Sequence, residues 1–192
     1  MATVMAPVMQ AWIELRADDP EAVSAFAVAR AGLAAAGGLE ELRRARLVEI
    51  TGSARSREQV DALLHASTQV YNPHKERCTL RAAAADPLPG RDPDRAEYVV
   101  VWERDGDRRP AVERWWRHET GESIEVREAV VWVVRFAPGI EAASAARELA
   151  QLRDARHGLL CNPWSQCMRA GPSPAELPWI RTGAHARPGG DA

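Results

Sequence analysis

The sequence carries the same short pattern twice, QVYNPHKE at residues 69–76 and LLCNPWSQ at residues 159–166. In each copy an Asn-Pro step follows apolar residues, and Glu or Gln stands four positions after the Asn. The same distance in sequence separates Asn72 from Asn162 and Glu76 from Gln166, and it is close to half of the 192-residue chain. The pattern therefore predicts an internal repeat.

Similar elements precede each copy. Val60, Leu63 and Leu64 share one face of a predicted helix at residues 57–67, and a weaker version of this spacing occurs at residues 140–156. Runs rich in β-branched or aromatic residues predict strands before these helices, at 45–51 and 129–136. Each half also opens with a strand and a helix, at 11–16 and 21–36 and again at 98–102 and 111–119, and closes with a short strand, at 77–82 and 167–170.

Prolines and glycines mark the expected boundaries. They cluster in a predicted linker at residues 84–96 and in a predicted irregular tail at residues 172–192, where only Leu177, Trp179 and Ile180 could anchor the chain. The sequence thus predicts an α+β protein with repeats at residues 10–83 and 97–171. Because neither repeat alone buries much apolar surface, we expect their sheets to pack on each other as an intramolecular pseudo-dimer.

The composition argues against several classes of partner. Twenty-five Lys and Arg oppose 27 Asp and Glu, a net charge of −2, whereas a protein that binds nucleic-acid phosphates needs a basic excess. No apolar run approaches the roughly 20 residues that span a membrane, and residues 1–10 lack the features of a secretion signal. We expect a cytoplasmic protein that binds neither nucleic acid nor membranes.

The sequence holds few candidates for catalysis. His157, Cys161 and Cys167 are close in sequence, but no CxxC or HxxxH pair accompanies them, and a zinc site needs at least three protein ligands. Cys161 follows two leucines, so we interpret it as a buried structural cysteine. Gly37 and Gly38 lack the other residues of a phosphate-binding loop. We predict no catalytic residue, no metal site and no cofactor.

Seven tryptophans contrast with two Phe and two Tyr. Trp12, Trp102 and Trp132 fall in predicted strands and are expected in the core or between sheets. Trp115 and Trp116 are neighbours on a predicted helix, where adjacent side chains point about 100° apart. One of them should lie at a boundary, and an aromatic partner surface and simple packing explain this pair equally well.

The Asn-Pro steps have an ordinary structural explanation. Asn is common where a helix ends, and a proline soon after cannot continue the helix. This explanation leaves out the Glu or Gln that follows four residues later in both copies. We therefore expect a duplicated structural corner, and a function for it is a hypothesis.

The first half resembles PurS, the small subunit of bacterial formylglycinamide ribonucleotide amidotransferase, or phosphoribosylformylglycinamidine synthase. PurS-like chains carry an Arg and a Glu on the middle strand, and a Leu-Leu-Ala-Asn step with Glu four residues after the Asn. Arg43, Arg46 and Glu49 match the strand pattern, and Asn72 and Glu76 match the corner.

The second half resembles the same family at its corner, where Leu-Leu-Cys-Asn ends at Asn162 and Gln166 replaces the Glu. On its middle strand Arg127 matches, while Val130 and Val133 replace the basic and acidic residues. The resemblance implies two tandem PurS-like repeats of ferredoxin-like βαββαβ type. In each of them the middle strand is expected to bend into a hairpin.

The resemblance also implies a function without catalysis. PurS-like subunits bridge a glutaminase subunit, PurQ, and an ATP-dependent synthetase subunit, PurL, and assist ammonia transfer between them. Charged residues would then form ion pairs at interfaces or hinges, and further homodimerisation stays open. Carried over to this chain, the partner interface comprises Arg43, Arg46, Glu49, Asn72, Pro73, Glu76, Asn162, Pro163 and Gln166.

Two other hypotheses fit the same elements. A dimeric α+β barrel could enclose an apolar substrate or ligand, as a small oxygenase or a ligand-binding protein. Its cavity would be lined by Trp12, Trp102 and Trp132 together with a histidine such as His65. A ligand-sensing module is the other. A large cavity lined by these tryptophans would favour the barrel, and a filled sheet interface with exposed Asn-Pro corners would favour the assembly subunit.

Overall fold

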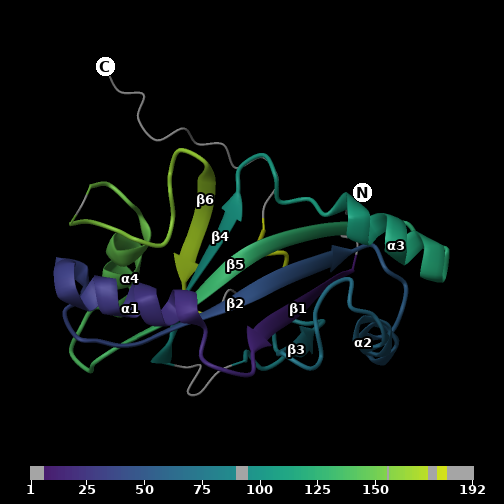
Figure 1. Ribbon diagram of the computed structural model, residues 1–192, viewed down its shortest axis with the longest axis horizontal. Coiled ribbons are helices and arrows are strands. Elements are labelled where there is room, and N and C mark those ends of the chain that lie inside the picture. Colours follow the sequence, from purple (N-terminus) through teal and green to yellow (C-terminus); the bar gives the residue numbers. More distant parts are fainter. Residues whose placement is uncertain (1–6, 90–94, 155, 173–176, 181–192) are drawn as a thin grey trace.

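The computed structural model describes residues 7–89, 95–154, 156–172 and 177–180. In this part of the chain, six strands form one antiparallel sheet in the order β3-β1-β2-β5-β4-β6, accompanied by four α-helices (Figure 1). The strands are β1 (Val8–Leu15), β2 (Leu39–Thr51), β3 (Glu76–Arg81), β4 (Glu97–Glu103), β5 (Glu125–Phe136) and β6 (Gln166–Gly171). The helical segments are α1 (Pro20–Gly32), the short 3₁₀ helix η1 (Ala34–Ala36), α2 (Arg57–Ala66), α3 (Pro110–Thr120) and α4 (Ala142–Ala150).

Local signals in the sequence explain where the helices begin and end. The Asp19 carboxylate accepts hydrogen bonds from the first turn of α1, just before Pro20. Ser56 and Gln59 form a capping box at the start of α2. Gly121 takes the left-handed conformation, φ 76°, that ends α3. The four predicted helices are confirmed.

Two helices end earlier than the sequence predicts. The first, expected to reach Ala36, stops at Gly32 and continues only as η1. The last, expected to reach Arg156, stops at Ala150. The N–H groups of Leu160 and Cys161 donate hydrogen bonds to the Ala150 carbonyl, which the next helical turn would otherwise use. A tertiary contact therefore replaces the end of α4.

The two halves of the chain join edge to edge. β2 and β5 are the central strands and pair from Leu39–Phe136 to Thr51–Glu125, with one irregularity near Glu41. The expectation that two sheets pack face to face is therefore wrong, because the central strands share backbone hydrogen bonds within one sheet. β2 contains no Gly or Pro and runs unbroken over 13 residues. Each half consequently contributes three strands, not the four of a βαββαβ unit.

The strand register relates the two halves position by position. Arg46 on β2 lies opposite Ile13 on β1, and Val130 on β5 lies opposite Val101 on β4. Arg46 and Val130 also lie opposite each other at the centre of the sheet. These two residues thus occupy corresponding positions, and below we call residues of the two halves corresponding when this register equates them.

The two faces of the sheet are covered differently. All four helices pack on the face that we call the helix face, α1 and α4 in one apolar cluster and α2 and α3 in another. The other face, the tail face, carries apolar residues of the four central strands, and Leu177, Trp179 and Ile180 of the tail pack on it. Trp179 and Ile180 are 0% and 2% exposed and Leu177 is half-buried, which confirms the predicted anchors. Residues 90–94 of the expected linker, and 173–176 and 181–192 of the expected tail, lie outside the described residues.

Within the described ranges, no helix has the length and apolar character needed to cross a membrane.

Candidate functional site: two Asn-Pro corners and a central ion-pair cluster

The first Asn-Pro corner is a closed network of hydrogen bonds before β3. The Asn72 N–H donates to Glu76 Oε2 at 2.6 Å, and the His74 N–H donates to Asn72 Oδ1 at 3.0 Å. Arg16, just after β1, donates from Nε to the Pro73 carbonyl at 3.2 Å. The corner is therefore fixed to the neighbouring strand as well as to itself.

The second corner repeats these contacts before β6. The Asn162 N–H donates to Gln166 Oε1 at 2.9 Å, and the Trp164 N–H donates to Asn162 Oδ1 at 3.0 Å. Arg104, just after β4, donates from Nη2 to the Pro163 carbonyl at 3.0 Å. The Glu or Gln four residues after the Asn thus has a structural role that the sequence did not reveal. It supplies one side-chain oxygen to the Asn N–H, which both residue types can do.

The tips of the two corners differ. The exposed residue two positions after the Asn is His74 in the first corner and Trp164 in the second. Trp164 is 89% exposed. β3 and β6 are the outermost strands (Figure 1), so the corners lie on opposite edges of the sheet. Trp164 is not among the interface residues predicted above, although it stands inside the repeated pattern. A tryptophan side chain that is exposed to this extent is characteristic of a protein interface.

An ion-pair cluster lies between the corners, at the centre of the helix face. Arg46 Nε contacts Glu128 Oε1 at 2.8 Å, and Arg46 Nη1 contacts Glu76 Oε1 at 3.2 Å. Arg109 Nε contacts the other oxygen of Glu128 at 2.6 Å. Burial opposes ionisation of Glu128, but its hydrogen bonds and attraction to both arginines keep its pKa below the usual value. Burial likewise lowers the pKa of Arg46, and the paired carboxylates more than offset it and raise that pKa. The cluster therefore holds Glu128 and Arg46 in their charged forms by mutual pairing.

A pair of ion contacts recurs in the two halves with the charges exchanged. In the first half Asp19, which caps α1, pairs with Arg44 on β2 at 3.2 Å. In the second half Arg109, which precedes α3, pairs with Glu128 on β5. Arg44 and Glu128 are corresponding residues, since both stand two positions from the central Arg46–Val130 pair. Both halves thus have an ion pair between the residue before the helix and the strand, but the acidic and basic partners are exchanged.

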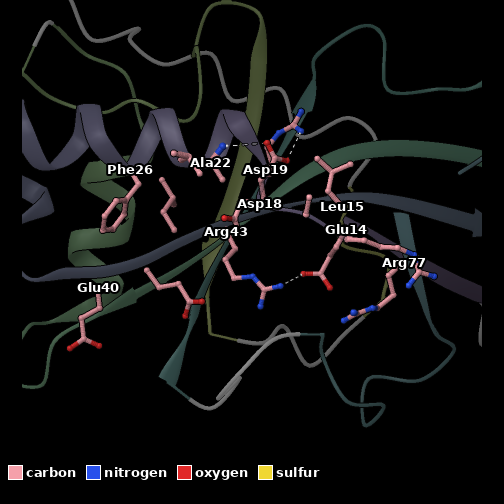
Figure 2. Close-up of a pocket in the computed structure, with 15 residues that line it drawn as sticks. Glu14, Leu15, Asp18, Asp19, Ala22, Phe26, Glu40, Arg43 and Arg77 are labelled. Carbon is pink, nitrogen blue, oxygen red and sulfur yellow. Dashed lines mark hydrogen bonds and ion pairs between the residues drawn. The ribbon is translucent and has the colours of Figure 1, made fainter. Parts of the chain in front are cut away.

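Arg43 and Glu49 both point to the tail face, in different surroundings. Arg43 contacts Glu14 at 2.8 Å on the wall of a groove of about 680 Å³ beside the start of α1 (Figure 2), and its side chain is 36% exposed. Glu49 is buried and accepts hydrogen bonds from Gln10 Nε2 and from the N–H groups of Trp179 and Ile180. Burial raises the pKa of Glu49 despite these donors. Glu49 therefore holds the tail, and a partner could reach Arg43 but not Glu49 in this conformation.

The adjacent tryptophans of α3 lie mostly inside the molecule. Trp116 is fully buried and donates to Glu122 Oε2 at 3.1 Å, while Trp115 is half-buried and meets Trp116 edge to face, with ring centroids 6.1 Å apart. Packing therefore accounts for Trp116. Only Trp115 keeps a boundary position, as the sequence predicted for one of the two.

The three strand tryptophans do not share a cavity. Trp12, Trp102 and Trp132 are buried, as expected, but Trp12 and Trp102 belong to the tail-face cluster and Trp132 to the helix-face cluster. The rings of Tyr98 and Trp179 pack against Trp12, with ring centroids 6.0 and 5.2 Å away. They fill the space beside it. The central sheet separates these side chains. This arrangement opposes the barrel hypothesis, which needs them around one space.

The cysteines have the properties of structural residues. Burial raises the pKa of the Cys161 thiol to about 11 and that of the Cys78 thiol to about 12, so both thiols stay protonated at neutral pH and are poor nucleophiles. The predicted burial of Cys161 is confirmed, at 2% exposure. Among the described residues, His, Cys, Asp and Glu form no group of three that could hold a metal ion.

Comparison with protein-family models, with curated proteins and with solved structures finds no match for this chain.

Proposed function

We propose that this protein is a non-catalytic assembly subunit of a glutamine-dependent, ATP-dependent amidotransferase of the purine type. It bridges a PurL-like synthetase and a PurQ-like glutaminase. Its halves are two PurS-like repeats, so one chain does the work of a dimer. The acceptor that such a complex aminates belongs to the synthetase.

The observation that carries this proposal is the pair of corners. Two hydrogen-bond networks of the same pattern lie on opposite edges of one continuous sheet and present different tips, His74 and Trp164. A duplicated frame with different tips suits a protein that holds two different partners at a fixed separation. A homodimer would offer the same tip twice.

The central charges support a role in assembly. Arg46, Glu76, Glu128 and Arg109 are held in mutual ion pairs, and a general acid or base must instead be free to exchange a proton with a substrate. A rigid bridge also suits ammonia transfer. Ammonia released into water at neutral pH is mostly protonated and no longer nucleophilic, so the two enzyme sites must be kept aligned and close.

Co-purification tests the proposal. The tagged full chain is mixed with a PurL-like and a PurQ-like protein from the same cell, in the presence of glutamine and ATP. We expect one complex that contains all three chains and transfers glutamine nitrogen to the synthetase substrate. Retention of neither partner would contradict the proposal, and so would turnover of a compound by the isolated chain.

Variants of the tips sharpen this test. Trp164→Ala and His74→Ala each remove one exposed side chain that packs against nothing essential, so both should fold normally. We expect each to weaken capture of one partner by about tenfold or more, the usual effect of losing an interface tryptophan or a central contact. Equal loss of both partners in either variant would argue against two separate docking sites.

A further inference from the structure

A cavity of about 270 Å³ lies on the helix face of the second half, between β4, β5 and the second corner. Val130, Leu160 and Gln166 are among the residues that line it. At the corresponding place in the first half, the side chain of Arg46 extends from β2 to the first corner. The first half therefore indicates that this place can accommodate an arginine side chain.

The correspondence follows from the register. Arg46 and Val130 correspond, as the central pair of the sheet and through their neighbours Ile13 and Val101. Val70 stands two residues before the Asn of the first corner, as Leu160 does in the second. The cavity thus lies where an arginine side chain would extend from position 130.

The atoms that hold Arg46 have counterparts around the cavity. Arg46 Nη2 donates to the Val70 carbonyl at 3.0 Å and Nη1 contacts Glu76 Oε1 at 3.2 Å. Their counterparts, Leu160 and Gln166, line the cavity. Gln166 Oε1 accepts from the Asn162 N–H and Gln166 Nε2 donates to Glu103, which also lines the cavity, so the Glu103 carboxylate takes the place of Glu76 Oε1 as an acceptor. The second half therefore offers a guanidinium group the Leu160 carbonyl and the Glu103 carboxylate, and it carries valine in place of the arginine.

The charges of the lining favour a cation. Glu21, Glu103 and Glu128 line the cavity, against Arg44 and Arg109. Glu128 already pairs with Arg46 and Arg109, and Glu21 pairs with Arg44. Among the described lining residues this leaves the carboxylate of Glu103, which accepts an amide N–H from Gln166, to pair with a guanidinium group.

One contact around Arg46 has no acidic counterpart, because Arg44 corresponds to Glu128. The Arg44 charge is already neutralised by Asp19 at 3.2 Å and Glu21 at 3.0 Å. Arg44 also lies over the ring of Trp132, 6.0 Å from its centroid. The Trp132 ring, which is 8% exposed, thus already stacks with one guanidinium group and forms a buried wall of the cavity.

We propose that this cavity binds the guanidinium group of an arginine side chain carried by a partner protein. Trp164, 89% exposed, belongs to the same corner as Gln166, which lines the cavity, and offers a partner protein a large apolar side chain. Trp and Arg are the residue types most enriched where protein interfaces concentrate their binding energy. The choice of a protein as the source of the arginine rests on the proposed assembly function, whereas the chemistry of the cavity does not.

A titration of the full chain with N-acetyl-L-arginine amide tests the chemistry directly. We expect a saturable shift of the Trp132 indole N–H resonance in NMR spectra. The capped amides of lysine and of the uncharged analogue citrulline should bind about tenfold more weakly, because neither combines a planar donor fork with a charge. Absence of the shift, or equal binding of all three compounds, would overturn the inference.

Two substitutions at one position supply an independent test. Val130→Arg provides the guanidinium from the chain itself, and Val130→Met provides a stem of similar length without the charge. We expect the arginine variant to melt about 2–4 °C higher than the methionine variant, as one additional net hydrogen bond would give in a domain of this size. It should also abolish the response to the arginine amide. An arginine variant that melts lower, or that still responds, would contradict the proposal.

The same variants separate this inference from the proposed function. In the co-purification experiment, Val130→Arg should weaken capture of one partner and Val130→Met should not. Full capture by both variants would overturn the docking role of the cavity while leaving the assembly function intact. A chain that binds the arginine amide but captures neither partner would instead overturn the assembly function.

Discussion

At the scale of single residues, side-chain oxygens define the corners. Glu76 and Gln166 each accept a hydrogen bond from the Asn N–H of their own corner, but only Glu76 also pairs with an arginine, Arg46. Gln166 instead donates its amide to Glu103 at 2.8 Å. The sequence pointed to these two positions through their spacing. Their partners follow from contacts between strands far apart in the chain, and no local pattern could show them.

Substitution of Glu76 should separate the two contacts. Glu76→Ala leaves the Asn72 N–H without its acceptor and should lower the free energy of unfolding by about 1–3 kcal/mol. Glu76→Gln keeps an oxygen for this N–H and loses the contact with Arg46, which still pairs with Glu128, so its cost should stay below about 1 kcal/mol. Urea denaturation of both variants measures the difference. Equal losses would mean that the ion pair, and not the corner, is the stabilising contact.

The buried carboxyl of Glu49 predicts a dependence on pH. Its folded-state pKa lies above the usual value of a glutamate carboxyl because burial disfavours the charged form. The folded state therefore binds the proton more tightly, and this stabilising effect is complete below the unfolded pKa and is lost as the pH rises through the folded one. Glu49→Gln removes this titration.

The free energy of unfolding of the wild type should consequently fall relative to that of Glu49→Gln as the pH rises from 4 to 8. Urea denaturation across this range measures it. If the free energy of unfolding of the wild type instead rose relative to that of the variant, the donors from Gln10, Trp179 and Ile180 would outweigh burial and favour the ionised form.

At the scale of elements, the sequence predicted the order of strands and helices, and the structure differs mainly at their ends. Capping residues such as Asp19, Ser56 and Gly121 are local, so they can be recognised from the sequence. The end of α4 depends on Leu160 and Cys161, which arrive from a later segment and bond to its last carbonyl. The expected hairpin in β2 is replaced by one long strand that pairs with both neighbours.

The segment at residues 177–180 should behave as an integral part of the core. Trp179 is fully buried and contacts Trp12, and Arg81 lies 5.5 Å from its ring centroid. Trp179→Ala should therefore lower the free energy of unfolding by about 3–5 kcal/mol. Chemical denaturation measures this loss, together with binding of a dye that reports exposed apolar surface.

Trp164→Ala is the matched control, since it removes the same side chain from an 89% exposed position. Its effect on the free energy of unfolding should stay within about 0.5 kcal/mol. If Trp179→Ala were equally mild, the tail would not be needed to cover the sheet.

At the scale of the whole molecule, the pairing of β2 with β5 is specific to two different halves. Arg46 lies opposite Val130 and contacts Glu128 across the join. If two copies of the first half paired through β2 in the same register, Arg46 would face Arg46 and Arg44 would replace Glu128. This repulsion would disfavour the homodimer. The sequence indicated two similar halves, but the way they join depends on this register, which the resemblance alone could not supply.

Separate expression of the halves tests this specificity. Residues 1–84 and 95–192, produced together, should assemble into a one-to-one complex with the circular dichroism spectrum of the intact chain. Residues 1–84 alone should not form a stable folded dimer, which size-exclusion chromatography and circular dichroism would show. A stable homodimer of the first half would contradict the role given to the central charges.

The outer strands carry a consequence for growth of the sheet. β3 and β6 have six residues each, and they carry Arg77 and Arg169. A strand arriving from another molecule would have to place its backbone beside these guanidinium groups, and short, charged edges of this kind discourage fibril formation. Contact with other proteins is thereby directed away from β-augmentation and toward side chains at the loops.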